Sequence, residues 1–207
     1  RDTFLFYHVA QYYADMAGPL RLLASYIVLA GLGTALGALL TWWVLPKLWH
    51  ILPTDKGREY AIDAEKSIGK PMSAGIVFIP IFMIVSILVV PFDWKFVGIL
   101  ACVAFAMVIG YLDDKSDTGW NEYRLGAIDL VIAIVASVII CELQPFVVWL
   151  PILKDSLVVS PLVFISVSTI LIWTSINATN CSDGVDGLSA SLSSMAILFL
   201  GGILYGI

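Results

Sequence analysis

Charged residues are scarce in this chain, and their scarcity excludes an ordinary soluble fold. Asp, Glu, Lys and Arg make up 13% of the 207 residues, hydrophobic residues make up 60%, and mean hydropathy is +0.95. A soluble domain of this size has roughly a quarter of its residues charged. Composition therefore predicts an integral membrane protein, whose net charge of -5 says little about its partners. We expect no nucleic-acid partner.

Cysteine is also sparse, and a removable leader is not apparent. Cys102, Cys141 and Cys181 are far apart and lack the spacing of a metal site, so we expect free thiols. The N-terminal residues show no basic segment followed by a short apolar core and a cleavage site, so no signal peptide is expected. The first membrane-spanning segment is expected to direct insertion.

Long apolar runs separated by polar segments make up most of the chain. Runs of this length are typical of helices that cross a bilayer. Six spanning helices are predicted, over residues 20–45, 73–90, 96–112, 125–141, 161–176 and 188–207. Aromatic residues within 2–17 favour an interfacial position, and alternating apolar residues within 142–160 allow a short hairpin. The predicted fold class is an all-α polytopic membrane protein with a single integral membrane domain.

The distribution of basic residues predicts the topology. Counting the crossings places three polar loops, residues 51–72, 113–124 and 177–187, on one face. Seven of the eleven Lys and Arg residues lie on that face, so the positive-inside rule predicts that it is cytoplasmic. They are Lys47, Lys56, Arg58, Lys66, Lys70, Lys115 and Arg124. We therefore expect the N-terminus and the end of the chain to lie outside.

Four polar side chains recur at every third position between the last two predicted spans: Asn177, Asn180, Asp183 and Asp186. On a helix, neighbouring members of this row share a face, whereas Gly184 and Gly187 favour a backbone that bends. Acceptor oxygens beside backbone N–H groups suit a hard cation and the phosphates that it carries. The alternative is a polar turn in which Asp186 or Ser182 caps a helix. Four polar side chains are more than such a cap requires.

A second acidic cluster, Asp113 and Asp114, follows the third predicted span directly. Adjacent carboxylates repel each other unless they share a proton or a cation. A bound Mg²⁺ would relieve the repulsion and could hold a diphosphate. A helix-terminal turn with solvated acids is the alternative. Because both clusters are expected at the same membrane face, we predict one site assembled from separate loops.

Two lysines and one intramembrane acid are further candidates for functional-site residues. Lys66 and Lys70 lie just before the second predicted span and could bind a phosphorylated substrate, although they would also serve to fix the topology. Asp129 lies about one turn inside the fourth predicted span. Acids inside membranes are often functional, but this one could instead pair with Arg124.

The segment 177–188 reads Asn-Ala-x-Asn-x-x-Asp-Gly-x-Asp-Gly-Leu and resembles the signature of the polyprenyl-phosphate N-acetylhexosamine-1-phosphate transferases. The Asp113–Asp114 pair resembles the second motif of that superfamily. Residues 69–75 occupy the place of its Gly-Thr-Pro-Thr-Met-Gly-Gly segment, with only the first glycine, the proline and the last glycine shared, and residues 151–155 resemble its Pro-x-x-Lys-Asp stretch. The superfamily usually has a lysine where this chain has Asp117. The chain resembles the first part of a ten-helix fold, so we expect the N-terminal portion of a longer protein.

The resemblance implies an enzyme, most similar to the branch that performs the first membrane step of peptidoglycan synthesis in the bacterial plasma membrane. That reaction transfers phospho-MurNAc-pentapeptide from its UDP conjugate to undecaprenyl phosphate, giving lipid I and UMP, with Mg²⁺ as cofactor. It also implies contact with membrane lipid, nucleoside antibiotics as ligands and, as a possible assembly, a homodimer. Three alternatives stay open. One is a GlcNAc-1-phosphate transferase of teichoic acid or O-antigen synthesis, another is a structural membrane subunit, and the last is an ion-coupled transporter, although transporters usually place their acids near the bilayer midplane.

Attack of a phosphate on a diphosphate chiefly needs alignment and charge neutralisation. The implied catalytic residues are Asp113, Asp114 and Asp183, of which one of the first two accepts the proton of the lipid phosphate or contacts the metal. The implied substrate-binding residues are Asn177, Asn180, Asp183, Asp186, Lys66, Lys70 and Arg124. The implied metal ligands are Asp113, Asp114, Asp183 and Asn180. A one-step transfer and a covalent aspartyl-phosphate both stay open.

Overall fold

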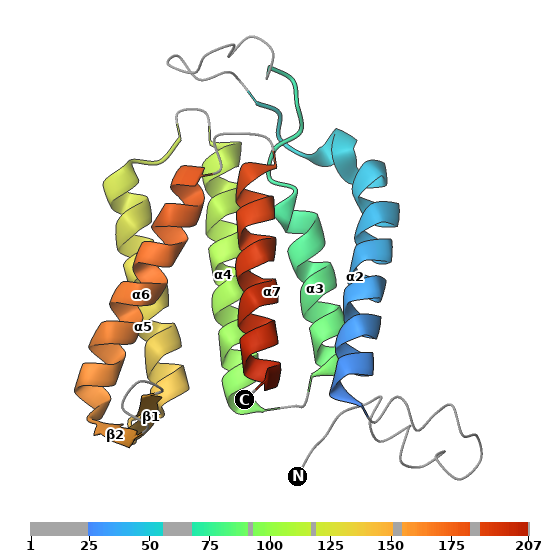
Figure 1. Ribbon diagram of the computed structural model, residues 1–207. Helices are drawn as coiled ribbons and strands as arrows, with labels where there is room; N and C mark the ends of the chain where they lie inside the picture. Colours follow the sequence, from blue (N-terminus) through green and yellow to red (C-terminus); the bar gives the residue numbers. More distant parts are fainter. Residues whose placement is uncertain are drawn as a thin grey trace, which may run out of the picture. The chain divides into compact units, whose positions relative to one another are not determined.

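The computed structural model describes residues 25–55, 68–90, 93–116, 119–150, 155–182 and 187–206. Six α-helices and one two-stranded sheet make up these parts of the chain (Figure 1). The elements are α2 (Tyr26–Leu48), the 3-10 turn η2 (Trp49–Ile51), α3 (Gly75–Val89), α4 (Trp94–Lys115), α5 (Glu122–Cys141), β1 (Phe146–Leu150), β2 (Asp155–Val159), α6 (Pro161–Ser182) and α7 (Leu188–Gly206). One described helix corresponds to each predicted span. The predicted interfacial segment 2–17 lies outside the described residues.

The helices are those of a membrane protein. Four helices of the described residues are long and apolar enough to cross a bilayer, namely α2 with η2, α4, α5 and α6. Helices α3 and α7 are apolar but shorter. Large apolar side chains point outward all along them, such as Trp42 at 78% and Leu198 at 75% exposure. A helix that exposes apolar side chains on this scale needs lipid or protein around it. The predicted all-α polytopic membrane fold is therefore confirmed.

Three helices extend beyond their predicted C-terminal ends. Helix α2 continues through Pro46 to Leu48, α4 continues through Lys115, and α6 continues to Ser182. Pro46 lies within the last turn of α2 and cannot donate the backbone hydrogen bond that a helix makes at that position. The predicted helices ended too early because hydropathy marks where a segment leaves the hydrocarbon. A helix can continue into the polar interface, where its backbone bonds stay intact.

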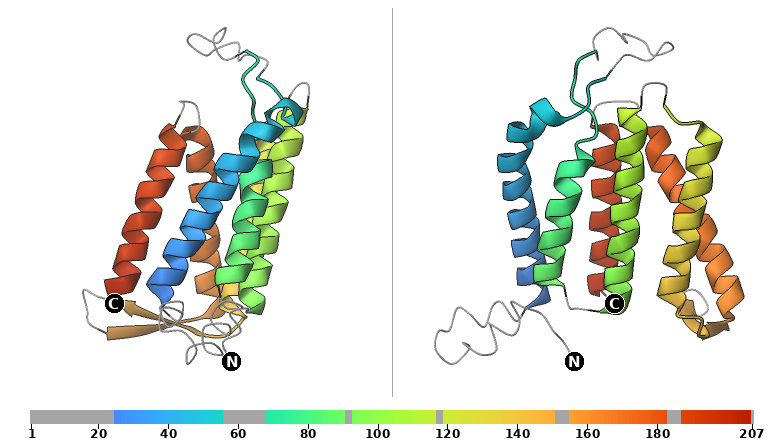
Figure 2. Two further views of the ribbon diagram at one scale, coloured as in Figure 1. Left: turned by 90° about the vertical axis from the view of Figure 1, so that its right-hand side faces the viewer. Right: turned by 180° about the vertical axis from the view of Figure 1, so that it is seen from behind.

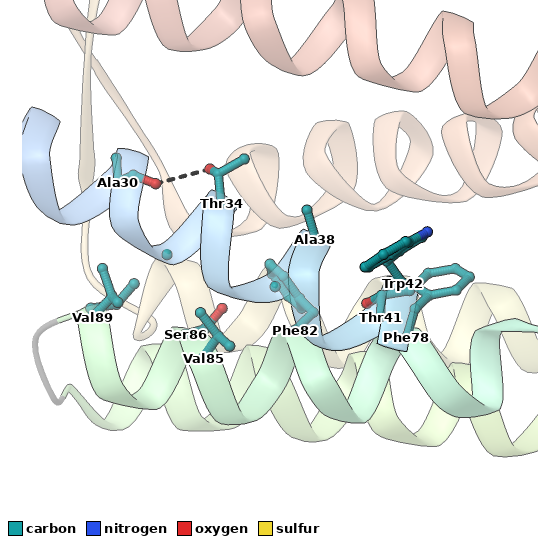
Figure 3. A pocket seen from close by; sticks show the side chains of 13 residues that line it. Ala30, Thr34, Ala38, Thr41, Trp42, Phe78, Phe82, Val85, Ser86 and Val89 are labelled. Atoms are coloured by element: carbon teal, nitrogen blue, oxygen red, sulfur yellow. Dashed lines mark hydrogen bonds between the residues drawn. The ribbon is translucent and has the colours of Figure 1, made fainter. Parts of the chain in front are cut away.

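The described chain divides into two compact units, residues 1–120 and residues 121–207, and each is considered by itself. In the first unit α2 packs on α3, and α3 packs on α4. An apolar groove of about 740 Å³ lies between α2 and α3, lined by small residues of α2 and by Phe and Val side chains of α3 (Figure 3). The Thr34 hydroxyl donates to the Ala30 carbonyl in this groove, at 2.9 Å. None of the predicted site residues lines it.

In the second unit α5 and α6 pack through small and polar side chains. Ala133, Ala136 and Ser137 of α5 are buried, and the Thr169 hydroxyl of α6 donates to the Ser137 hydroxyl at 3.2 Å. Small residues allow two helix backbones to approach closely inside a membrane. The Trp173 indole N–H donates to the Gly126 carbonyl at 2.8 Å. These two side-chain bonds fix α6, and with it the polar residues at its C-terminal end, against α5.

A β-hairpin joins α5 to α6, as the sequence predicted. Strands β1 and β2 are antiparallel, and their register runs from Phe146 opposite Val159 to Leu150 opposite Asp155. Figure 2 shows the two strands beneath the ends of the helices that they connect. The Phe146 ring stacks on Phe164 in the first turn of α6, with ring centroids 4.2 Å apart. This contact fixes the hairpin to the helix that follows it.

Candidate functional site

Asp113 and Asp114 lie in the last turn of α4, and not in the loop beyond it as the sequence analysis placed them. Ser116 ends the helix, because both its N–H and its hydroxyl donate to the Asp113 carbonyl, at 3.0 and 2.7 Å. These bonds satisfy a carbonyl that the helix end would otherwise leave unpaired. Both carboxylates are half-buried. They are therefore held on regular backbone at the polar end of an apolar helix.

The two carboxylates have different partners. The Trp120 backbone N–H donates to Asp113 Oδ1 at 2.6 Å. The Ser73 hydroxyl donates to Asp114 Oδ2, also at 2.6 Å. Neighbouring helical residues point about 100° apart, so an adjacent pair reaches different surroundings. Asp113 thus anchors the segment that follows α4, whereas Asp114 is bonded to the segment that precedes α3.

The segment before α3 is itself ordered by backbone pairing. Hydrogen bonds of 2.7 to 2.9 Å join residues 53–55 to residues 69–72, and Thr54 forms an antiparallel bridge with Pro71. Lys70 belongs to this ladder, and its side chain is exposed. Because Ser73 follows the ladder and bonds Asp114, the fold brings the Lys70 segment to the acidic end of α4. Lys66 lies outside the described residues.

Lys115 is the lysine nearest to the acidic pair in the sequence. Its ammonium lies over the Tyr111 ring of the same helix, 5.8 Å from the ring centroid. A cation at this distance is attracted by the face of the ring. Asp117, which occupies the place of the superfamily's lysine, lies outside the described residues.

Residues 177–182, which include the first two members of the Asn/Asp row, are helical, where the sequence analysis had placed a loop. Asn177 and Asn180 lie in the last turns of α6, and Asp183 and Asp186 lie outside the described residues. The Asn177 amide donates to the Trp173 carbonyl at 2.8 Å, and Asn180 is exposed. Asn177 therefore bonds the backbone of its own helix.

The backbone bends at Gly187, as predicted. Its φ is +81°, in the left-handed region that glycine adopts without strain. Leu188 begins α7 directly after it. The segment 177–188 therefore starts on α6 and has a left-handed residue, Gly187, directly before α7.

Arg124 and Asp129 both belong to α5. Arg124 is exposed in the first turn, which Asn121 caps by accepting the Tyr123 N–H at 2.9 Å. Asp129 lies about two turns inside the helix, because α5 begins at Glu122, and it is half-buried.

The donor set at the end of α4 fits a hard divalent cation. Mg²⁺ in proteins is usually held by one or two carboxylates, with waters and substrate phosphates completing its shell. Asp113 and Asp114 supply two such carboxylates at a half-exposed helix end. Within the described ranges no three His, Cys, Asp or Glu side chains gather as a complete metal cluster. The pair therefore suits a cation shared with a substrate better than a closed structural site.

One family model matches this chain, and the similar proteins described here carry one name. The sequence model of glycosyl transferase family 4 matches residues 96–206. A phospho-N-acetylmuramoyl-pentapeptide-transferase of Treponema pallidum (strain Nichols) is 41% identical over 192 residues, which cover 91% of this chain and 53% of the relative. Proteins of the same name from Nostoc punctiforme and Nitratiruptor are 30% and 27% identical, covering 78% and 86% of the chain and 47% and 54% of the relatives. The chain thus spans about half the length of these curated relatives. No solved structure matches it.

Proposed function

The chain belongs to glycosyl transferase family 4, and on that premise we propose that the protein transfers phospho-MurNAc-pentapeptide from its UDP conjugate to undecaprenyl phosphate. The products are lipid I and UMP. The relatives named phospho-N-acetylmuramoyl-pentapeptide-transferase support this choice of sugar donor. The observation that carries the proposal is the acidic pair Asp113–Asp114, held in the last turn of an apolar helix.

This position suits a reaction between a soluble and a lipid substrate. Helix α4 is apolar enough to cross a bilayer and carries the two acids in its last turn. A polyprenyl phosphate keeps its tail in hydrocarbon and its phosphate at the membrane surface. Carboxylates at the end of a spanning helix are therefore at the depth of the lipid phosphate. The sequence-based topology assigns this face to the cytoplasm, where a nucleotide-linked sugar is available.

The transfer forms one P–O bond and breaks another. An oxygen of undecaprenyl phosphate attacks the phosphorus attached to the sugar, and UMP leaves with the electrons of the broken bond. Bound Mg²⁺ would supply neutralisation of the diphosphate charge. We assign Asp113 and Asp114 to holding that ion or to accepting the proton of the lipid phosphate. The exposed Lys70 side chain is assigned to the phosphates of the substrate.

The remaining assignments come from the resemblance. Asn180 and Asp183 bind the uridine or the metal-bound diphosphate, and Asn177 and Asp186 organise the segment that carries them. The bond from the Asn177 amide to the Trp173 carbonyl is in keeping with an organising role. Lys66 and Arg124 add positive charge for the phosphates.

A comparison of the two sugar donors tests the proposal. The protein, expressed from its complete reading frame and purified in detergent, is given undecaprenyl phosphate, Mg²⁺ and either radiolabelled UDP-MurNAc-pentapeptide or radiolabelled UDP-GlcNAc. We expect a lipid-linked product from the first donor at a rate higher by about a hundred-fold or more, because a site built to bond the peptide rejects a donor that lacks it. Preference for UDP-GlcNAc would instead assign the protein to teichoic acid or O-antigen synthesis.

A further inference from the structure

Ser73 has a backbone conformation that serine rarely adopts. Its φ is +57°, in the left-handed region that disfavours residues with a Cβ atom. Such strain persists only where the surrounding structure imposes it, and it often accompanies function. Here the Met72 N–H donates to the Pro53 carbonyl on one side, at 2.7 Å, and α3 begins at Gly75 on the other. Ser73 is thus fixed between a backbone ladder and a helix.

This conformation directs the Ser73 hydroxyl to Asp114. The hydroxyl donates to Oδ2 at 2.6 Å, in a part-buried position, across 41 residues of sequence. That length is typical of a hydroxyl bonded to an ionised carboxylate, which is among the stronger hydrogen bonds in proteins. Because the bond links the start of α3 to the end of α4, it sets the orientation of the carboxylate relative to both helices.

We propose that Ser73 is a positioning residue that holds the Asp114 carboxylate in the orientation required for phosphosugar transfer. The inference rests on the proposed function, in which Asp114 contacts the substrate or its metal ion. The strained backbone is retained because it directs the hydroxyl, so the hydroxyl serves turnover while the backbone conformation lowers stability. These two contributions can be separated by substitution.

Three variants separate the effect of the hydroxyl on turnover from the effect of the backbone conformation on stability: Ser73→Gly, Ser73→Ala and Ser73→Thr. Glycine removes the hydroxyl and relieves the strain, alanine removes the hydroxyl alone, and threonine keeps the hydroxyl but adds a β-branch that disfavours positive φ. We expect S73G and S73A to lower kcat about ten-fold with little change in KM, since each loses one hydrogen bond to a charged group. S73T should keep kcat within about three-fold of wild type, because its hydroxyl remains.

The order of the variants in thermal unfolding in detergent is expected to differ from their order in turnover. S73G should melt at a higher temperature than S73A, because both lose the hydroxyl and only glycine relieves the strain, and S73T should melt below the wild type. Ser116→Ala is the matched control, because it removes a hydroxyl from the same helix end that bonds only the Asp113 backbone carbonyl. Its turnover should stay within about two-fold of wild type, because the Asp113 carbonyl keeps its bond to the Ser116 N–H.

The inference is overturned if S73G turns over at the wild-type rate, or if turnover follows thermal stability across the series. If S73T does not fold, S73G and S73A still decide the outcome, because a purely structural role predicts that S73G is fully active. A wild-type protein that makes no lipid product overturns the proposed function itself. That result differs from an active wild type with an equally active S73G, which overturns only the role of Ser73.

Discussion

Asp114→Asn is expected to reduce transfer to undecaprenyl phosphate about a thousand-fold or more, in protein that still folds. The amide has the shape of the carboxylate, and its carbonyl oxygen can still accept the Ser73 hydroxyl. It lacks the negative charge that holds Mg²⁺ and cannot accept a proton at neutral pH. Stabilisation of charge in a phosphoryl transition state is worth several kcal/mol, and each 1.4 kcal/mol or so is ten-fold in rate.

Asp93→Asn is the matched control for this substitution. Asp93 is the N-cap residue at the opposite end of the same helix, and its side chain makes no capping hydrogen bond. Its variant should retain turnover within about two-fold, because an exposed substitution of this kind has little effect. Initial rates with saturating donor, together with thermal unfolding, compare the two. Near-normal rates for D114N would reject the assignment of Asp114 to the site.

Asp183→Asn is expected to have an effect of similar size, about a thousand-fold or more. Asp183 follows the last residue of α6 directly and belongs to the row that begins with Asn177. In the assignment from the resemblance it binds uridine or the metal-bound diphosphate. An amide at this position loses a charged acceptor where a phosphate-bound cation or a nucleobase N–H needs one.

The control for Asp183 is Asp155→Asn, on strand β2 of the hairpin before α6. Its Oδ1 accepts the Ser156 N–H at 2.7 Å, a bond that asparagine can also form. We expect normal turnover and normal melting from this variant. Measurement of kcat and of KM for the nucleotide sugar shows which step Asp183 serves. A D183N enzyme that matches wild type in both constants would remove Asp183 from the site.

Hydropathy and spacing predicted the helices and the hairpin because these features depend on local sequence. Alternating apolar residues between two spans predicted β1 and β2, and apolar runs predicted α2 to α7. The helix ends were predicted less well. Asp113 and Asn177 both belong to helices that continue beyond their apolar segments. The sequence did not predict this, because hydropathy records where a segment meets water and not where its backbone hydrogen bonds stop.

The partners of the site residues could not be predicted from the sequence. Asp113 and Asp114 are identical adjacent residues in the sequence, but the helix directs their side chains differently, toward Trp120 and Ser73. The bond from Ser73 depends on tertiary contacts and on a left-handed backbone, neither of which a local pattern reveals. Trp173 was also missed, because a tryptophan near the end of a span is usually a membrane-interface residue. In this fold it donates to Gly126 and thereby fixes the helix that carries Asn177.

The transfer reaction itself tests the account most directly. The protein from its complete reading frame is incubated with radiolabelled UDP-MurNAc-pentapeptide and undecaprenyl phosphate, in Mg²⁺ and in parallel with excess chelator. We predict one UMP released for each lipid-linked sugar phosphate formed, no product with chelator, and recovery when Mg²⁺ is restored. Failure to form any lipid-linked product in Mg²⁺, by protein shown to be folded, would contradict the assignment of this chain to phosphosugar transfer.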